Sequence, residues 1–299
     1  MIIIKLWGGL GNQFFQYAYG YQLAQRTHEP IILDISWFCK KPNKKNHVYR
    51  IPKILKYKIE YYSIIDYKCQ PFRFKLMNMK IVNKIVRIPS FTLYHLGKID
   101  YLKETRGIYS SKIESFYSHN CYLDGYWQCP KYFSNYRNQI KNLFQMKQPY
   151  SETVIKLKRL IDHTNAVAIH IRRTDYVINY KHRLMSKLSG VLDFSYYEKC
   201  IQVLISTQPK FFIFSDDPQW CEDKFSKLNL DYLIVSNEKF SDTDELYLMS
   251  QFKTMIIANS TFSWWGAYLN NNENCKIFTP NKGFGNTDIL PKEWIVISY

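Results

Sequence analysis

The sequence predicts an α/β protein with parallel sheets and two domains. Short apolar runs alternate with amphipathic helical patterns, most regularly after residue 150. Strands separated by helices of this length form right-handed βαβ units, which build parallel sheets. A chain of 299 residues is also long enough for two domains. We place the boundary near Gln148-Pro149-Tyr150, which gives domains 1–149 and 150–299.

The N-terminal half begins as a regular βαβ pattern and then becomes irregular. Phe14, Ala18 and Tyr21 are spaced to share one buried helical face. The segment from about 40 to 120 is basic and rich in tyrosine, and its elements are uncertain. The elements expected in this half are a strand over 2–6, a glycine turn over 8–11, a helix over 13–27, a strand over 30–34, a strand near 122–125 and a helix over 130–144.

The C-terminal half alternates helices and strands throughout. Val154, Leu157 and Ile161 align on one helical face, and Pro218 suits the first turn of a helix. The expected helices are 151–163, one from about 195, 218–227, 243–252 and 261–270. The expected strands are 166–171, 210–215, 231–236, 254–258 and 276–279.

The net charge of +16 calls for a partner or a solvated surface to account for it. Basic residues concentrate between Lys40 and Arg106, a region able to attract a polyanion. Nucleic acid is not expected, because no helix-turn-helix, zinc-finger spacing or RNP-type aromatic signature occurs. An anionic membrane surface, a phosphate-bearing substrate and an ordinary basic face remain open. Charge alone therefore identifies no function, and a non-catalytic polyanion-binding protein stays as the non-enzyme alternative.

The cysteines favour a reducing compartment. There are seven, an odd number without a CxxC pair, so a disulfide framework is not expected. The apolar run at 1–6 meets Gly8 too soon to be a signal peptide or a membrane span. We therefore expect a cytoplasmic protein, with peripheral attachment at the cytoplasmic face of the inner membrane as an alternative that the basic segment leaves open.

The segment 170–176, HIRRTDY, directly follows an apolar strand. In open α/β sheets ligands bind beyond the carboxyl ends of the strands, and planar guanidinium groups suit phosphate oxygens. Arg172 and Arg173 thus point to a phosphorylated ligand. The alternative is a surface ion pair between Arg173 and Asp175.

The glycine turn 8–11 lies between a strand and a helix, where backbone can approach a ligand closely. It lacks the third glycine of the dinucleotide fingerprint, and no GK[ST] follows it. By its shape alone it is either a ligand-binding turn or a tight connection without a ligand.

Two further strand exits carry polar residues. Asn259 or Ser260 can cap a helix and leave hydroxyls and N–H groups at a strand end, which suits phosphate, although plain N-capping explains the same residues. Trp264 and Trp265 cannot face the same way on a helix, so we expect one in the core and the other over a cleft.

At the other strand exit, Asp216 can accept hydrogen bonds from N1 and N2 of guanine, or the pair 216–217 can cap the helix that begins at 218.

A metal site is not expected. The segment 242–244, DTD, resembles the metal site of nucleotide-sugar enzymes, but it opens a helix and is better explained as capping. The acidic pair 216–217 offers too few ligands by itself.

Taken in order, the motifs resemble those of the bacterial α-1,2-fucosyltransferases of glycosyltransferase family 11. The resemblance spans nearly the whole chain and is weakest over 40–120. It is carried by the segments 8–13 (GGLGNQ), 125–128 (GYWQ), 170–176 (HIRRTDY), 214–217 (FSDD), 260–266 (STFSWWG) and 291–294 (PKEW).

The resemblance implies a fold and a reaction. The fold is of the GT-B type, with two Rossmann-like domains facing a central cleft, an acceptor-side domain over 1–149 and a donor domain over 150–299. The reaction is inverting transfer of L-fucose from GDP-β-L-fucose to the 2-hydroxyl of a terminal β-galactoside, without cofactor or metal. The acceptor would be a galactose-terminated oligosaccharide or a lipid-linked glycan. An α-1,6 linkage or another GDP-sugar is the alternative, and the oligomeric state is not predicted.

The resemblance also implies residue roles. Arg172 would contact the β-phosphate, His170 and Asp216 would lie near guanine or ribose, and Asn12 would border the fucose. Arg173, beside Arg172, would organise the loop through Asp175. The implied catalytic residues are Arg172, Asn12 and Asp175. The implied GDP-fucose-binding residues are Gly9, Gly11, Gln13, His170, Arg172, Asp216, Ser260, Thr261 and Ser263.

The general base is not singled out by spacing. An inverting displacement benefits from a carboxylate near the acceptor hydroxyl. The candidates are Asp175, Glu245, Asp124 and Asp193.

Overall fold

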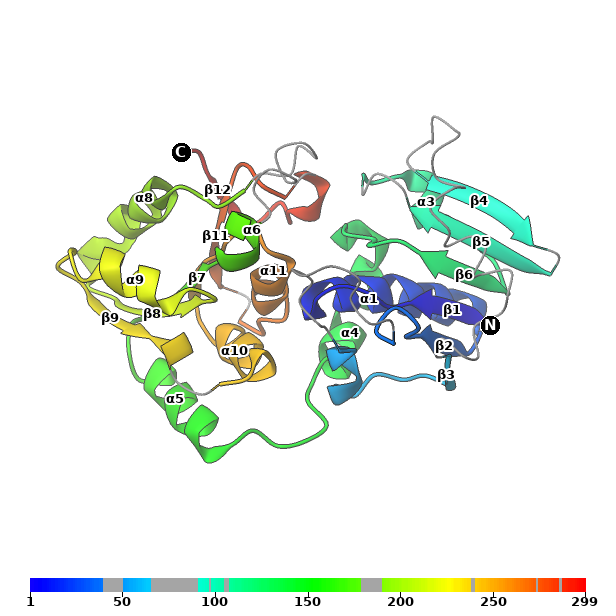
Figure 1. Ribbon diagram of the computed structural model, residues 1–299, viewed down its shortest axis with the longest axis horizontal. Coiled ribbons are helices and arrows are strands. Elements are labelled where there is room, and N and C mark those ends of the chain that lie inside the picture. The colour runs from blue at the N-terminus through cyan, green and yellow to red at the C-terminus, as the bar shows by residue number, and fades with distance from the viewer. Residues whose placement is uncertain are drawn as a thin grey trace. The chain divides into compact units, whose positions relative to one another are not determined.

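The chain divides into two compact units, Met1–Gln148 and Pro149–Tyr299, each built on a six-stranded sheet (Figure 1). The sequence places this boundary between residues 149 and 150. The computed structural model describes residues 1–39, 51–65, 91–96, 98–104, 108–178, 190–237, 240–272, 274–284 and 287–299. Much of the basic stretch between 40 and 106 lies outside these ranges.

Unit 1 has the sheet order β3-β2-β1-β6-β5-β4. All its strand pairs are parallel except β4 with β5. Its strands are β1 (Ile2–Lys5), β2 (Ile31–Asp34), β3 (Ser63–Ile65), β4 (Phe91–Leu96), β5 (Ile99–Glu104) and β6 (Cys121–Asp124). Its helices are α1 (Leu10–Thr27), α3 (Ser111–Glu114) and α4 (Arg137–Leu143), with 3₁₀ turns η1 (Lys53–Lys56), η2 (Pro130–Tyr132) and η3 (Ser134–Tyr136).

Helix α1 is buried along most of its length and packs closely on β1. A Cβ atom added at Gly20 would lie 2.2 Å from Cδ1 of Ile4, so only glycine allows this approach. The ring of Phe14 stacks on Phe144 with centroids 4.0 Å apart. The helix begins three residues earlier than expected because Gly9 is already its N-cap residue.

The helix expected over 130–144 is wrong in its first half. The structure has two 3₁₀ turns there, and the α-helix starts at Arg137. Phe133 lies between the two turns with φ −140° and ψ 15°, outside the helical region, and this interrupts the helix. Tyr132 accepts a hydrogen bond from the Ser110 amide at 2.9 Å, and Phe133 packs on Phe15. These tertiary contacts of aromatic side chains outweigh local helix propensity.

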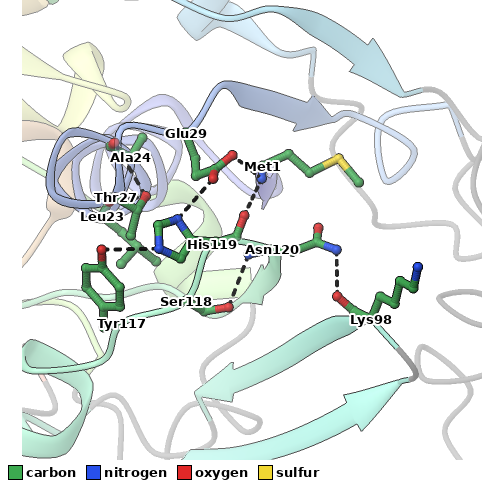
Figure 2. A network of polar contacts seen from close by, with 10 residues as sticks. All are labelled: Met1, Leu23, Ala24, Thr27, Glu29, Lys98, Tyr117, Ser118, His119 and Asn120. Carbon is green, nitrogen blue, oxygen red and sulfur yellow. Dashed lines mark hydrogen bonds and ion pairs between the residues drawn. The ribbon is translucent and has the colours of Figure 1, made fainter.

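The amino ends of β1 and β6 are tied together by a polar network (Figure 2). The Met1 ammonium donates to Glu29 at 2.7 Å and to the carbonyl of His119. The other carboxylate oxygen of Glu29 lies 3.0 Å from Nδ1 of His119, whose Nε2 contacts the hydroxyl of Tyr117. This edge of the sheet is therefore occupied by structural contacts.

Unit 2 is parallel throughout, with the sheet order β12-β11-β10-β7-β8-β9. Numbered from its own first strand, this is the 3-2-1-4-5-6 order of a Rossmann fold. Its strands are β7 (Ala166–Ile171), β8 (Lys210–Ser215), β9 (Asp231–Ile234), β10 (Thr254–Ile256), β11 (Lys276–Pro280) and β12 (Ile295–Ile297). Its helices are α5 (Glu152–Asp162), α6 (Thr174–Ile178), α8 (Phe194–Leu204), α9 (Pro218–Phe225), α10 (Asp242–Met249) and α11 (Thr261–Tyr268), with 3₁₀ turns η4 (Ile205–Thr207), η5 (Val235–Asn237) and η6 (Thr287–Ile289).

The expected helices and strands of this half are confirmed, with ends that shift by a few residues. The expectation missed β12, whose three residues leave much of their side-chain surface exposed. Its apolar run of three residues is too short to distinguish a strand from a loop by sequence pattern.

Each sheet has a point where the strand order reverses, and we call this the switch point. In unit 1 it lies between β1 and β6, and in unit 2 between β7 and β10. Ligands of open α/β sheets bind outside the carboxyl ends of the strands at such points. The residues that follow β1, β6, β7 and β10 are therefore the first candidates for a site.

Candidate active site

The switch point of unit 2 brings together two of the motifs singled out in the sequence. Strand β7 leads into His170, Arg172 and the short helix α6, while β10 leads into Asn259 and helix α11. Two segments almost ninety residues apart thus end side by side at one sheet edge. This is the arrangement expected for a phosphate-bearing ligand.

Arg172 is held at this edge by a carboxylate. Its Nη1 lies 3.2 Å from Oδ2 of Asp216, at the exit of the neighbouring strand β8. Its guanidinium also lies 6.0 Å from the ring centroid of Tyr176. The side chain keeps 27% of its surface exposed, so a ligand can still reach it.

Asp216 fixes the turn that carries Arg172. Its oxygens accept from the amides of Arg173 at 2.8 Å and Thr174 at 3.2 Å, and from the Thr174 hydroxyl. The carboxylate thereby binds the first N–H groups of α6 across the sheet, as a capping residue would. Its expected contact with guanine or ribose remains a prediction, and its present contacts give it a positioning role.

Arg173 has other partners than the expected Asp175. Its Nε lies 3.1 Å from Asp217, and its guanidinium covers the Trp220 ring at 4.0 Å. Asp217 also accepts from the Trp220 amide at 3.3 Å and so caps α9, as the alternative for the pair 216–217 predicted. The side chain of Asp175 lies outside the described residues. Arg173 therefore anchors this loop rather than offering a second cation to a ligand.

His170 is buried and uncharged. It is 4% exposed, and burial together with the Arg172 guanidinium lowers its pKa to about 3. Its Nδ1 has no hydrogen-bond partner among the described residues. The ring faces Phe262 in the first turn of α11, with centroids 5.7 Å apart. A neutral imidazole whose buried Nδ1 is unpaired among the described residues is thus held beside the start of α11.

The start of α11 carries three residues of the expected set, and their contact with the donor stays a prediction. Ser260 is the N-cap residue, and its hydroxyl accepts from the Phe262 amide at 3.3 Å. Ser263 is different: it is fully buried and donates to backbone carbonyls, including that of Ala258 at 3.4 Å. Its hydroxyl is turned into the core of the unit. Thr261 is half-buried in the first turn.

Both tryptophans of the same helix are buried, so the expectation that one covers a cleft is wrong. Trp264 and Trp265 are each 0% exposed. Trp264 donates to the carbonyl of Ile289 at 2.7 Å and stacks on Tyr268. The helix is enclosed on several sides, so residues on different helical faces all reach the core.

The acidic segment 242–244 is a helix start. Ser241 and Asp244 form a capping box: the Ser241 hydroxyl accepts from the Asp244 amide at 3.3 Å, and the Asp244 carboxylate accepts from the Ser241 amide at 3.0 Å. The capping explanation of this segment is therefore confirmed. Within the described residues, no group of three or more His, Cys, Asp or Glu is placed to hold a metal ion.

The glycine turn forms the switch point of unit 1. Gly8 has a φ of +80° and Gly9 is the N-cap residue of α1, whose first turn also holds Gly11. Asn12 accepts from Nε2 of Gln128 at 3.0 Å. This brings the exits of β1 and β6 together, as the switch point requires.

Gln13 is a structural residue, in contrast to its expected contact with the donor. It is 1% exposed. Its amide nitrogen donates to the carbonyls of Gly8 at 3.1 Å and Ile51 at 3.2 Å, and its oxygen accepts from the Ile54 amide at 3.1 Å. The side chain joins the glycine turn to η1 and has no donor left for a ligand.

Three of the candidate bases have defined surroundings. Asp124 is 2.9 Å from Nζ of Lys5 and accepts from the Tyr101 hydroxyl at 2.6 Å. Asp193 caps α8 through the Ser195 amide, which lowers the pKa of its carboxyl. Burial raises the pKa of Glu245 to about 7.

Glu245 lies in a chain of hydrogen bonds beneath the Asp216 turn. The Ser215 amide donates to Ser236 at 2.9 Å, and the Ser236 hydroxyl donates to Glu245 at 2.7 Å. The sequence does not reveal this chain, because Ser215, Ser236 and Glu245 come from three separate elements. Their only signal is that Ser215 and Ser236 each stand at an expected strand end.

Comparison with known proteins supports the resemblance in the sequence. The model of the family "Glycosyl transferase family 11" matches residues 1–298. The chain belongs to glycosyltransferase family 11.

Its relatives include enzymes of bacterial glycan assembly. The O-antigen biosynthesis glycosyltransferase WbnK of Escherichia coli is 32% identical, over 93% of each chain. An alpha-1,2-colitosyltransferase of Escherichia coli is 29% identical over 99% of each chain. A galactoside 2-alpha-L-fucosyltransferase of Caenorhabditis elegans is 28% identical over 50% of this chain and 43% of its own.

Solved structures agree on the fold of this family 11 glycosyltransferase. NodZ alpha-1,6-fucosyltransferase soaked with GDP-fucose has a TM-score of 0.50 and 15% identity, covering 90% of this chain and 91% of its own. The two α/β units with parallel sheets are of the GT-B type, which confirms that part of the fold prediction. Among the described residues, no helix has both the length and the apolar character needed to span a membrane.

Proposed function

We propose that this family 11 glycosyltransferase transfers L-fucose from GDP-β-L-fucose to the 2-hydroxyl of a terminal β-galactoside, with inversion at C1. The observation that carries the proposal is the convergence of Arg172, His170 and the start of α11 at the switch point of unit 2. A guanidinium, an uncharged imidazole and a helix N-terminus together suit a nucleoside diphosphate. The fucosyltransferases among the relatives support the choice of sugar.

The chemistry follows from the charge that develops during transfer. As the bond between C1 and the β-phosphate oxygen breaks, negative charge accumulates on GDP. Fixed cations and dipoles that face this charge stabilise the transition state. Arg172 supplies the cation, and Asp216 keeps it in place by binding both its guanidinium and the backbone that follows it.

The neutral state of His170 fits a role at the nucleoside. With a pKa of about 3, its ring carries no charge at physiological pH and adds no repulsion beside Arg172. Its Nδ1 is buried and has no hydrogen-bond partner among the described residues, and it is proposed to exchange one hydrogen bond with a base or ribose group. Asn12, in the glycine turn of unit 1, is proposed to border the fucose, and Asp175 is kept as the candidate base.

The test is incubation of the purified protein with a panel of GDP-sugars and galactosides, followed by NMR of the product linkage. We expect transfer from GDP-fucose and an α-1,2 linkage, with GDP as the released product. Calorimetry should show that GDP binds. A protein that neither binds GDP nor transfers fucose contradicts the proposal.

Metal independence is part of the proposal and has its own test. We expect turnover to continue in excess EDTA, because Arg172 and the start of α11 are proposed to supply the stabilisation that a cation gives other enzymes. Initial rates with and without EDTA check this. Loss of turnover that Mg²⁺ or Mn²⁺ restores would show that a cation is required.

A second donor is favoured by one observation. The relative that matches over 99% of each chain is a colitosyltransferase. Colitose is L-fucose without the 3-hydroxyl, so the phosphate site described above suits either GDP-sugar. GDP-colitose therefore belongs in the panel, and the ratio of kcat/KM for the two donors decides between them.

The proposed site of action is the cytoplasm. No disulfide joins the described cysteines, which suits a reducing compartment; they are Cys39, Cys121, Cys129, Cys200, Cys221 and Cys275. Fractionation of cells that express the tagged protein tests this placement and any peripheral association with the inner membrane.

A further inference from the structure

The switch point of unit 1 carries an aromatic pair that the donor site does not use. Trp7 follows β1 and Tyr126 follows β6, the two strands between which the order of the sheet reverses. Their rings stack with centroids 3.9 Å apart and an angle of 29° between the planes. Both residues are only half-buried, so the pair reaches the surface where this fold binds ligands.

The turn that carries Tyr126 is fixed by a buried carboxylate. Glu104, at the end of β5, accepts from the amides of Tyr126 at 2.7 Å and Trp127 at 2.8 Å. A Cβ atom added at Gly125 would lie 2.5 Å from the Cβ of Glu104 and 2.7 Å from the Trp127 ring. The turn is thus built around a glycine and an acidic side chain.

Backbone strain marks the same turn. Trp127 has a φ of +56°, a conformation that costs a residue with a side chain about 1–3 kcal/mol. The Trp127 ring is fully buried and stacks on Tyr19, which holds the residue in this conformation. Such strain persists where the surrounding structure enforces it, and it concentrates at binding sites. The turn after β1, the neighbouring strand, also contains a positive φ, at Gly8.

Among the described residues, the polar groups around the pair are amides and charges of both signs. Asn12 and Gln128 are hydrogen-bonded to each other beside it. Lys5 is paired with Asp124 at 2.9 Å, and Lys103 stands opposite Asp124 in the register of β5 and β6. The indole N–H of Trp7 has no hydrogen-bond partner among the described residues. Aromatic faces flanked by amides suit a neutral ring with many hydroxyls better than an anion.

We propose that Trp7 and Tyr126 form the platform on which the acceptor sugar rests, and that the sugar is a hexopyranose that stacks its apolar face on this pair. The inference rests on the proposed function and adds the acceptor subsite to it. A β-galactoside meets the requirement, because its axial 4-hydroxyl leaves H3, H4 and H5 together on one face. Glu104 is a positioning residue for the platform, since it acts through the backbone of Tyr126 and Trp127.

The experiment measures transfer to methyl β-D-galactopyranoside by the wild type and by Tyr126→Ala and Tyr126→Leu. Loss of the aromatic face should raise the KM for the galactoside roughly three- to tenfold, the range expected for an aromatic contact. The KM for GDP-fucose, and its hydrolysis without acceptor, should stay at the wild-type values. Tyr126→Phe should keep the galactoside KM, because the ring is retained.

The matched control is Tyr117→Ala. Tyr117 is an exposed aromatic residue at the opposite, amino end of the same sheet (Figure 2). Its removal should leave both KM values unchanged. Thermal melts of every variant show whether each one is folded.

A direct measurement keeps the inference testable without turnover. In saturation-transfer NMR of the wild type with methyl β-D-galactopyranoside, irradiation of aromatic protons should saturate H3, H4 and H5 most strongly. The same signals should weaken in Tyr126→Leu and remain in Tyr117→Ala.

The outcomes separate this inference from the proposed function. Wild-type transfer with an unchanged galactoside KM in folded Tyr126→Ala and Tyr126→Leu overturns the platform and leaves the function standing. A raised KM for GDP-fucose alone overturns it too, because Tyr126 would then serve the donor. If the wild type transfers no fucose, the proposed function fails, and the NMR signals alone decide whether a galactoside uses this surface.

Discussion

The two switch points occupy equivalent places in their sheets but carry different chemistry. In unit 2 the strand exits present Arg172, Asp216, a neutral His170 and the start of α11. In unit 1 they present the stacked pair Trp7 and Tyr126. The first suits an anion and the second suits the face of a neutral ring. The topology therefore decides where a ligand binds, and the residues after each strand decide which ligand it is.

The largest effect is expected from Arg172→Ala, which tests whether the switch point of unit 2 binds an anion. If this guanidinium faces the leaving diphosphate, its loss should cost about 2.7–4 kcal/mol of transition-state stabilisation, seen as a lower kcat. The fold should survive, because Asp216 still binds the amides of Arg173 and Thr174. Steady-state kinetics and thermal melts check this. Arg159→Ala, which removes an exposed arginine of α5, is the control. Near-normal turnover of folded Arg172→Ala would contradict the anion-binding role assigned to unit 2.

The next largest effect is expected from Gly125→Ala, which tests the other switch point. The new methyl group would collide with Glu104 and with the Trp127 ring. Overpacking of this kind typically lowers the free energy of unfolding by about 1–3 kcal/mol. Urea unfolding measures the loss, and the galactoside KM should rise while GDP affinity is retained.

Gly266→Ala provides the control for that variant. Its added Cβ atom would lie 3.0 Å from Met249, whose side chain is flexible, and alanine favours the helix by about 0.5–1 kcal/mol. A loss of stability as large as in Gly125→Ala would mean that glycine replacement as such, and not the packed turn of unit 1, is being measured.

The smallest effect concerns Glu245 and the dependence of stability on pH. Burial raises the pKa of this carboxyl to about 7, above its ordinary value of 4.5, so between these pH values the folded state binds more protons than the unfolded state. The Glu245 contribution to stability is therefore present at low pH and is lost as pH rises towards 7. In Glu245→Gln, the fall of the unfolding free energy with rising pH that Glu245 causes should disappear.

Unfolding free energies of the wild type and Glu245→Gln across pH 4.5–8 test that expectation. The matched control is Glu152→Gln, which changes an exposed glutamate at the start of α5. Equal slopes in the wild type and Glu245→Gln would show that Glu245 does not titrate in this range, and the hydrogen-bond chain beneath Asp216 would then be insensitive to pH.

Residues next to one another in the chain were predicted well. The strands 166–171 and 210–215 match the structure because buried parallel strands are continuous apolar runs. Capping at Ser260 and in the segment 242–244 was also predicted, since caps depend on residues within one turn; the structure adds Ser241 as the N-cap residue of the second helix. The helix over 130–144 failed where aromatic contacts from distant segments override local propensity.

Within the candidate site the sequence predicted Arg172 and the start of α11 as neighbours of a phosphate-bearing ligand, because each follows an apolar strand. The family resemblance, and not the strand pattern, suggested His170 near guanine or ribose. It also suggested Gln13 and Ser263 as ligand contacts. The structure shows both to be buried, with their polar atoms bonded to backbone. A polar side chain in a ligand-binding motif and one that ties the motif together look the same in a sequence.

The sequence by itself determined the α/β class, the division into two units and the three segments from which the proposed donor site is built. Those features depend on apolar periodicity and on capping, which are local. Tertiary structure alone decided that Arg172 pairs with Asp216, that Arg173 pairs with Asp217, and that Trp7 stacks on Tyr126. Each of these pairs joins residues from different strand exits, and only the order of strands in the folded sheet brings such residues within contact distance.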